Sequence, residues 1–284
     1  MFPFVEIGRV MEILSPQIIT LFILFGSLAG LLAGLLGIGG GVILVPLFLW
    51  AFPLAGFEPD VIVHAAFGTS LAIIFPTSIS STIGHRKRNN VDWDHVAFLA
   101  LGGIGGSIFG ASLAAALSGH ALKALFGLMQ IGIGLKMFVS RTYLPPEDRL
   151  PPDVRKLILV GFAAGAFSSF FGVGGGVVAV PLMVLFLRLP IHFAVGNSSA
   201  LIVISSLSST ILYIVHGWGE KGLADFSLGY VNILVVIMVA PLTILFARFG
   251  VRLASHFSHD RLMKVFSLIL ILIGARLAVG FIIN

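Results

Sequence analysis

The chain has 284 residues, of which 58% are hydrophobic and only 10% are charged, and its mean hydropathy is +1.10. Soluble domains carry about 25% charged residues, so this chain has too few polar side chains to cover a water-exposed surface. The 17 Lys and Arg residues give a net charge of +5, but most lie in short segments between apolar runs, a pattern that sets membrane topology and does not indicate nucleic-acid binding.

Apolar runs recur along the chain in two sets with the same internal order. Each set begins with a long run, reaches a glycine cluster, continues with a short run and ends with three longer runs. The sequence therefore predicts an all-α polytopic membrane protein with two repeats of about five segments, or about 8 to 10 transmembrane helices including the short ones. The predicted segments are residues 16–36, 40–55, 61–84, 95–117 and 121–140, then 154–171, 175–190, 192–216, 226–247 and 262–282.

The two glycine clusters have nearly the same sequence. GIGGGVILVP at residues 37–46 recurs as GVGGGVVAVP at residues 172–181, an offset of 135 residues. Glycine in a helix interior costs about 1 kcal/mol relative to alanine, so three adjacent glycines indicate a helix break. A helix that restarts after a break has unpaired N–H groups and about half a positive charge at its first turn. We therefore predict that Val42 and Val177 begin helices whose first turns bind an anion.

The alternative role for these glycines is close packing between helices, which small residues allow in membranes. A packing face at helical spacing does not need three adjacent glycines, and this favours the anion site. The predicted substrate-binding glycines are Gly39, Gly40 and Gly41 in the first repeat and Gly174, Gly175 and Gly176 in the second.

A polar step follows each cluster. Thr69 and Ser70 align with Asn197 and Ser198 at an offset of 128 residues. Hydroxyl and amide groups donate hydrogen bonds to an oxyanion without a full charge, which permits both binding and release. We predict that all four residues bind substrate. The alternative is that they bond to their own or neighbouring helices, as such residues commonly do in membranes.

His64 and His192 align at the same offset, near the starts of their segments. Histidine changes its charge near neutral pH, so the pair is a candidate for gating or proton coupling, and an interfacial position is the alternative. Asp92 and Asp225 precede predicted helices and are predicted N-caps.

Several function classes lack candidate residues. The chain has no cysteine and no Asp or Glu deep in an apolar segment. It contains no recognisable nucleophile with its base, no metal-ligand cluster and no nucleotide-binding loop. We therefore predict a protein that is not an enzyme and has no cofactor and no metal site.

The aligned positions indicate an internal duplication. Residues 1–142 form the predicted first repeat, residues 143–153 a cytoplasmic linker and residues 154–284 the second repeat. If every segment crosses once, 13 of the 17 basic residues fall on one side, which the positive-inside rule makes cytoplasmic. An odd number of crossings then inverts the second repeat. Re-entrant short segments, at residues 40–55 and 175–190, are the alternative. They would give parallel repeats and separate the basic loops, so we favour the inverted arrangement.

The paired motifs resemble those of the TauE/SafE family of sulfite exporters. The resemblance rests on the twin glycine motifs and on the Gly-Thr-Ser and Gly-Asn-Ser steps, and it covers nearly the whole chain. It implies transport of sulfite, sulfoacetate or other organosulfonates across the bacterial inner membrane, with the glycines and polar steps above as the site. We expect a secondary transporter that works by alternating access, with a small anion and membrane lipid as partners and no nucleic acid. An anion channel of the same fold and a carrier for a different small anion are the alternatives. The resemblance leaves open the anion, the transport direction, the coupling ion and the oligomeric state.

Overall fold

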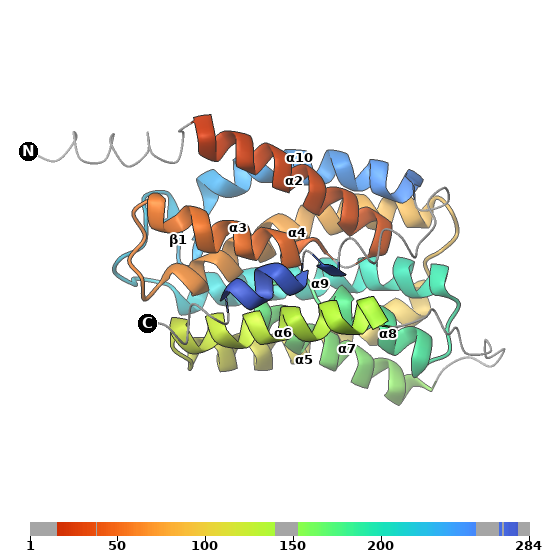
Figure 1. Ribbon diagram of the computed structural model, residues 1–284. Helices are drawn as coiled ribbons and strands as arrows, with labels where there is room; N and C mark the ends of the chain where they lie inside the picture. The colour runs from red at the N-terminus through yellow and green to blue at the C-terminus, as the bar shows by residue number, and fades with distance from the viewer. Residues whose placement is uncertain (1–15, 38, 140–152, 254–266, 269, 278–284) are drawn as a thin grey trace, which may run out of the picture.

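The computed structural model describes residues 16–37, 39–139, 153–253, 267–268 and 270–277. Helices account for nearly all of these residues, and a single two-stranded hairpin is present in the described ranges (Figure 1). The helices of the first half are α2 (Pro16–Leu36), α3 (Gly41–Leu54), α4 (Ile62–Arg86), α5 (Trp93–Ala115) and α6 (Gly119–Val139). The second half contains α7 (Val154–Phe171), α8 (Gly176–Leu185), α9 (Ile191–His216), β1 (Ser227–Leu228), β2 (Val231–Asn232) and α10 (Ile233–Leu253), and residues 270–277 are also helical.

These helices confirm the predicted all-α polytopic membrane fold. Among the described residues, α4, α5, α7, α9 and α10 are each long and apolar enough to cross a membrane. Large apolar side chains stay more than half exposed along their outer faces, including Leu101, Leu159 and Ile237. Exposed apolar surface of this extent is typical of a protein surrounded by lipid.

Two predicted segment boundaries were wrong. The segment predicted at 175–190 ends as a helix at Leu185, because the chain adopts a φ of 52° at Arg188 and approaches Pro190, which disfavours helix in the residue before it. The segment predicted to begin at 226 becomes helical only at Ile233, since the preceding residues form the β1–β2 hairpin.

The helices pack in pairs that join the two halves. In one pair α2 packs against α10, and in the equivalent pair α7 packs against α5. Gly30 on α2 lies directly against the backbone of Thr243, and Gly165 on α7 lies directly against the backbone of Gly103. A Cβ at either glycine would collide with a backbone carbonyl, so small residues allow these helices to touch. The halves are therefore interlocked rather than separate bodies.

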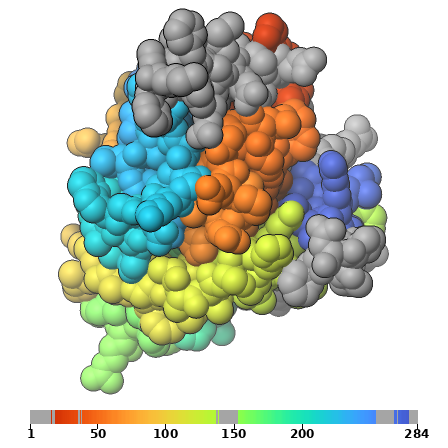
Figure 2. Space-filling view, turned by 90° about the vertical axis from the view of Figure 1, so that its left-hand side faces the viewer, coloured from red at the N-terminus to blue at the C-terminus, as the bar shows by residue number. Residues whose placement is uncertain are grey.

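The helices α4 and α9 lie against each other between these two pairs, α4 also packing on α10 and α9 on α5. Equivalent connections of the two halves lie at opposite ends of the molecule (Figure 1). At one end, residues 55–61 meet residues 217–232 through a hydrogen bond from Glu58 N to Gly222 O of 2.9 Å. Figure 2 shows this end, with the turn after α3 in orange beside the cyan loop before α10. At the other end, residues 87–92 reach the start of α9. The two halves consequently run antiparallel.

The two ends of the molecule differ in charge. Basic residues gather where α4 and α10 end and α7 begins, whereas Glu58, Asp60 and Glu220 lie at the opposite end. The basic group consists of Arg86, Lys87, Arg88, Arg155, Lys156, Arg188, Arg248 and Arg252.

Candidate functional site

Two helix breaks lie at the centre of the molecule, one in each half. The first separates α2 from α3, and the second separates α7 from α8. Gly39 and Gly40 have φ values of 87° and 77°, and their counterparts Gly174 and Gly175 have 88° and 73°. Only glycine adopts this left-handed backbone at little cost. The glycines are therefore required by the turn itself, and Gly40 and Gly175 cap the new helices.

The two breaks touch each other. A Cβ added to Gly39 would lie 3.3 Å from the Cα of Gly174, and a Cβ added to Gly174 would lie 3.3 Å from the Cα of Gly39. Ile74 of α4 and Ile202 of α9 flank this contact, at 3.1 and 3.5 Å from the same added Cβ of Gly174. The structure thus brings the predicted glycines of both halves to one point, between α4 and α9.

Ser70 and Ser198 cross-link the breaks. The Ser70 hydroxyl on α4 donates to the carbonyl of Gly172 at 2.8 Å, and the Ser198 hydroxyl on α9 donates to the carbonyl of Gly37 at 3.0 Å. Each serine therefore binds the break of the opposite half. Because carbonyls at a helix end have no partner within the helix, these bonds satisfy groups that would otherwise be buried and unpaired.

Thr69 and Asn197 face away from the breaks and hold the loops that precede α10 and α5. The backbone N–H of Asn232 donates to Thr69 Oγ1 at 3.0 Å, and that of Asp92 donates to Asn197 Oδ1 at 2.8 Å. The structure therefore does not gather all four polar residues at one point. Gly68, next to Thr69, lies against the carbonyl of Tyr230, so the loop packs closely on the helix.

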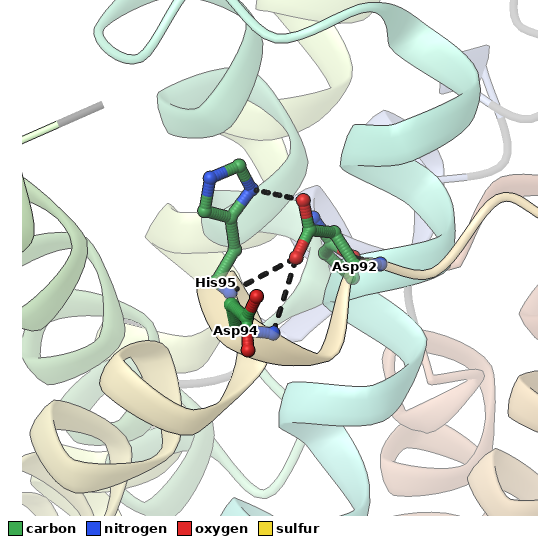
Figure 3. A network of polar contacts seen from close by, with 4 residues as sticks. Asp92, Asp94 and His95 are labelled. Carbon is green, nitrogen blue, oxygen red and sulfur yellow. Dashed lines mark hydrogen bonds and ion pairs between the residues drawn. The ribbon is translucent and has the colours of Figure 1, made fainter. Parts of the chain in front are cut away.

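Asp92 and Asn232 cap the helices that follow these loops. Asp92 Oδ1 accepts hydrogen bonds from the N–H groups of Asp94 and His95, at 3.1 and 3.3 Å, and its other oxygen pairs with the His95 ring (Figure 3). Asn232 Oδ1 accepts from Val235 N at 3.1 Å. The predicted cap at Asp225 was therefore wrong, because the chain forms the hairpin before α10 starts and Asn232 takes the capping position.

Comparison with known proteins identifies the family. The sequence model of the family described as "Sulfite exporter TauE/SafE" matches residues 22–277.

The chain belongs to the TauE/SafE family.

Curated relatives of this TauE/SafE chain are named as transporters. A "Probable membrane transporter protein" of Haemophilus influenzae is 30% identical over 259 residues, which cover 90% of this chain and 96% of the relative. A protein of the same name from Xylella fastidiosa is 31% identical, over 88% of this chain and 90% of the relative. YunE of Bacillus subtilis, also a probable membrane transporter, is 25% identical over 90% of this chain and 96% of the relative. No solved structure matches the chain. The protein is a multi-pass membrane transporter of this family and not an enzyme.

The two aligned histidines have different surroundings in this TauE/SafE protein. His64 is buried, with Nε2 at 3.2 Å from the carbonyl of Ala114 and its ring stacked on Tyr230 at 5.1 Å. His192 is exposed, and its ring lies 4.7 Å from that of Phe193. The gating role predicted for the pair remains a prediction. If the two histidines share that role, one performs it from a buried position and the other from an exposed one.

Three buried polar groups without a partner were not predicted from the sequence, or were predicted only in part. Among the described residues, Asn197 Nδ2, Ser168 Oγ and Gln130 Oε1 are buried and have no hydrogen-bond partner. Gln130 Nε2 donates to the carbonyl of Val42 at 2.8 Å. That carbonyl would normally accept from residue 46, but Pro46 has no N–H. Pro46, inside a short apolar helix, was the sequence feature that indicated a donor from another helix for this carbonyl.

Proposed function

We propose that this protein is a secondary transporter that moves sulfite or a small organosulfonate across the bacterial inner membrane by alternating access. The observation that supports the proposal is the meeting of the two helix starts, α3 and α8, between the antiparallel halves. The family description names sulfite, and the chemistry of the helix starts suits an oxyanion.

The first turns of α3 and α8 supply hydrogen-bond donors. Bonding within α3 begins with Ile43 and Leu44, whose N–H groups both donate to the carbonyl of Gly40. In α8 it begins with Val178 and Ala179, which donate to Gly175. The N–H groups before these have no partner inside their helix, and the helix dipole adds about half a positive charge there. An anion with several oxygen atoms can accept bonds from both starts.

The glycines then have two roles: they form the left-handed turns, and their N–H groups contact the anion. In this proposal Gly39, Gly40 and Gly41 present their N–H groups from one half, and Gly174, Gly175 and Gly176 present theirs from the other. A Cβ at Gly39 or Gly41 would meet Val173 or Gly174 of the other half, so in this proposal the anion reaches these N–H groups when the two starts move apart. Asn197 Nδ2, a buried donor without a partner among the described residues, supplies a further hydrogen bond when the site opens toward it.

Alternating exposure follows from the two loops that close on α4 and α9. Residues 87–92 close on Gly196 and Asn197 at the basic end, and residues 217–232 close on Gly68 and Thr69 at the acidic end. Release of one loop opens the centre to one side while the other loop stays bound. The positive-inside rule makes the basic end cytoplasmic.

Purified protein in liposomes tests this proposal. Uptake of radiolabelled sulfite, sulfoacetate or taurine should saturate with concentration, and vesicles preloaded with unlabelled substrate should show accelerated exchange. The matched pair of variants is Asn197→Ala, which removes the free Nδ2 donor together with the acceptor of Asp92 N, and Ser206→Ala, which removes a hydroxyl bonded to its own helix at Ile202. Only the first should lower transport. Flux that neither saturates nor shows exchange would indicate an anion channel, and absence of flux for every anion would contradict the proposal.

A further inference from the structure

The last turn of α7 contains a buried hydroxyl that makes no hydrogen bond. Ser168 is fully buried, and its Oγ has no partner among the described residues. Serines inside helices usually donate to a carbonyl three or four residues earlier. Ser206 and Ser208 do so here, at 2.6 and 2.9 Å. The neighbouring Ser169 pairs with Ser209. Ser168 therefore stands apart from the other serines of this core, and burial of an unpaired hydroxyl is unfavourable.

Ser168, although part of α7, lies beside the start of α8. A Cβ added to Gly175, which caps α8, would lie 3.0 Å from Cβ of Ser168. The carbonyl of Ser168 accepts from Val173 N at 3.3 Å, so the residue also closes the end of α7. The unpaired hydroxyl and the first-turn N–H groups of α8, which have no partner within that helix, thus lie beside the same glycine.

The first half has no hydroxyl at the equivalent position. The residue equivalent to Ser168 at the offset of 135 is Ala33, which is buried on α2. Both caps pack against the same position of the preceding helix, Gly40 against Ala29 and Gly175 against Ala164, but Ser168 is an additional close neighbour at Gly175. Apart from this difference, the backbone of the two starts is closely similar. Within the described residues, the start of α8 therefore has a side-chain donor from the preceding helix that the start of α3 lacks at the equivalent position.

We propose that Ser168 is a substrate-binding residue whose hydroxyl donates to an oxygen of an oxyanion bound at the first turn of α8. This inference rests on the anion transport proposed above. The proposal implies that the second half binds the anion more tightly than the first. There, one oxygen of the anion accepts from the first turn of α8 and another accepts from Ser168. An oxyanion with at least two free oxygens, such as sulfite or a sulfonate, fits this pair of donors.

Sulfite binding to the purified full-length protein tests the assignment. The variants are Ser168→Ala, Ser168→Cys, which keeps the shape at a slightly larger size but is a weak donor, and Ser206→Ala as the matched control. Dissociation constants come from calorimetry, and melting temperatures are measured with and without sulfite. Because a hydrogen bond to a charged group is worth a tenfold change in affinity or more, both Ser168 variants should raise the Kd about tenfold.

The melting temperature without sulfite distinguishes binding from a structural role. Ser168→Ala should melt at or above the wild-type temperature, since it removes an unpaired buried group, whereas Ser206→Ala should melt lower and keep the wild-type Kd. Wild-type affinity in both Ser168 variants would overturn the assignment and leave the transport proposal intact. A wild-type protein whose melting temperature and calorimetric heat respond to none of sulfite, sulfoacetate and taurine would overturn both.

Discussion

The two helix breaks have the same backbone but different polar surroundings. Both have left-handed glycines, and each accepts a serine hydroxyl from the opposite half. We call these glycines and the bonds from Ser70 and Ser198 the common frame of the two breaks. The side chains around the frame differ. At the start of α3, Gln130 donates to the carbonyl of Val42. Leu270 stands at the equivalent position of the second half, at the offset of 140 residues that aligns Gly134 with Gly274. The start of α8 has Ser168, where Ala33 stands in the first. The repeated contacts therefore hold the breaks, and the unrepeated polar groups are where the two halves differ in what they can bind.

A second matched position shows how far the frame tolerates changes in chemistry. His85 Nε2 lies 3.3 Å from the carbonyl of Gly34, and the hydroxyl of Tyr213 donates to the carbonyl of Ser169 at 2.8 Å. These residues are equivalent at the offsets of 128 and 135. Two different side chains thus make the same contact near the ends of α2 and α7. Conservation of the contact, and not of the residue, identifies it as structural.

The largest loss of stability is expected for Gly37→Ala and Gly172→Ala, which test the common frame. A Cβ at Gly37 would lie 2.8 Å from the carbonyl of Val195, and one at Gly172 would lie 2.7 Å from the Cα of Phe67, both at positive φ. The left-handed backbone and the overpacking together should destabilise each variant by about 2–5 kcal/mol, measured by denaturant unfolding in detergent.

Gly219→Ala is the control for that pair. Gly219 also has a positive φ, of 80°, but nothing lies within 4 Å of an added Cβ. This variant should lose only about 1–2 kcal/mol, from the backbone alone. Equal losses at all three positions would show that the contact between breaks and helices adds nothing to stability.

The next test removes the crossed serine bonds. Ser70→Ala and Ser198→Ala each leave a buried carbonyl without its donor, so each should cost about 1–3 kcal/mol. If the frame is symmetric, the two losses should agree closely. Ser208→Ala, which breaks a bond inside its own helix, should cost less. A large loss at one serine only would mean that one break is held by other contacts.

The sequence predicted the frame well because glycine patterns and hydropathy report backbone requirements directly. The breaks and the apolar helices follow from local composition. The sequence also paired Ser70 with Ser198, but as substrate-binding residues, and their bonds to the breaks were not predicted. The hairpin before α10 was missed because apolar residues continue through it from Phe226, and hydropathy does not distinguish a short strand from a helix start.

The site was harder to predict than the frame. Ser168 in an apolar helix would ordinarily bond to its own backbone, and only the tertiary structure shows that it does not. Thr69 and Asn197 were predicted to bind substrate together with Ser70 and Ser198. A helix turns by about 100° per residue, so Thr69 Oγ1 and Asn197 Oδ1 accept from the loops, whereas the two serines donate to the breaks. Which polar groups remain free is decided by packing between distant segments, and sequence spacing does not contain that information.

A smaller test makes the first half resemble the second. Gln130→Leu places at α6 the residue type of the second half and leaves the carbonyl of Val42 without its donor. We expect a loss of about 1 kcal/mol, since the unpaired Oε1 of Gln130 is removed at the same time. Pro46→Ala restores an N–H for that carbonyl, so it should recover stability in the Gln130→Leu background. Strictly additive effects of the two substitutions would contradict this account of Gln130.

The smallest effect is expected at His192. Its side chain is exposed, so His192→Ala should change the unfolding free energy by no more than about 0.5 kcal/mol. His64→Ala should be clearly more destabilising, because it empties a buried site between Ala114 and Tyr230. The transport assay then tests the coupling role: if only His64 is coupled to protons, the pH dependence of uptake should change in His64→Gln and stay the same in His192→Ala. An altered pH profile in His192→Ala would show that an exposed histidine controls access at the basic end, and the two halves would then share this role despite their different surroundings.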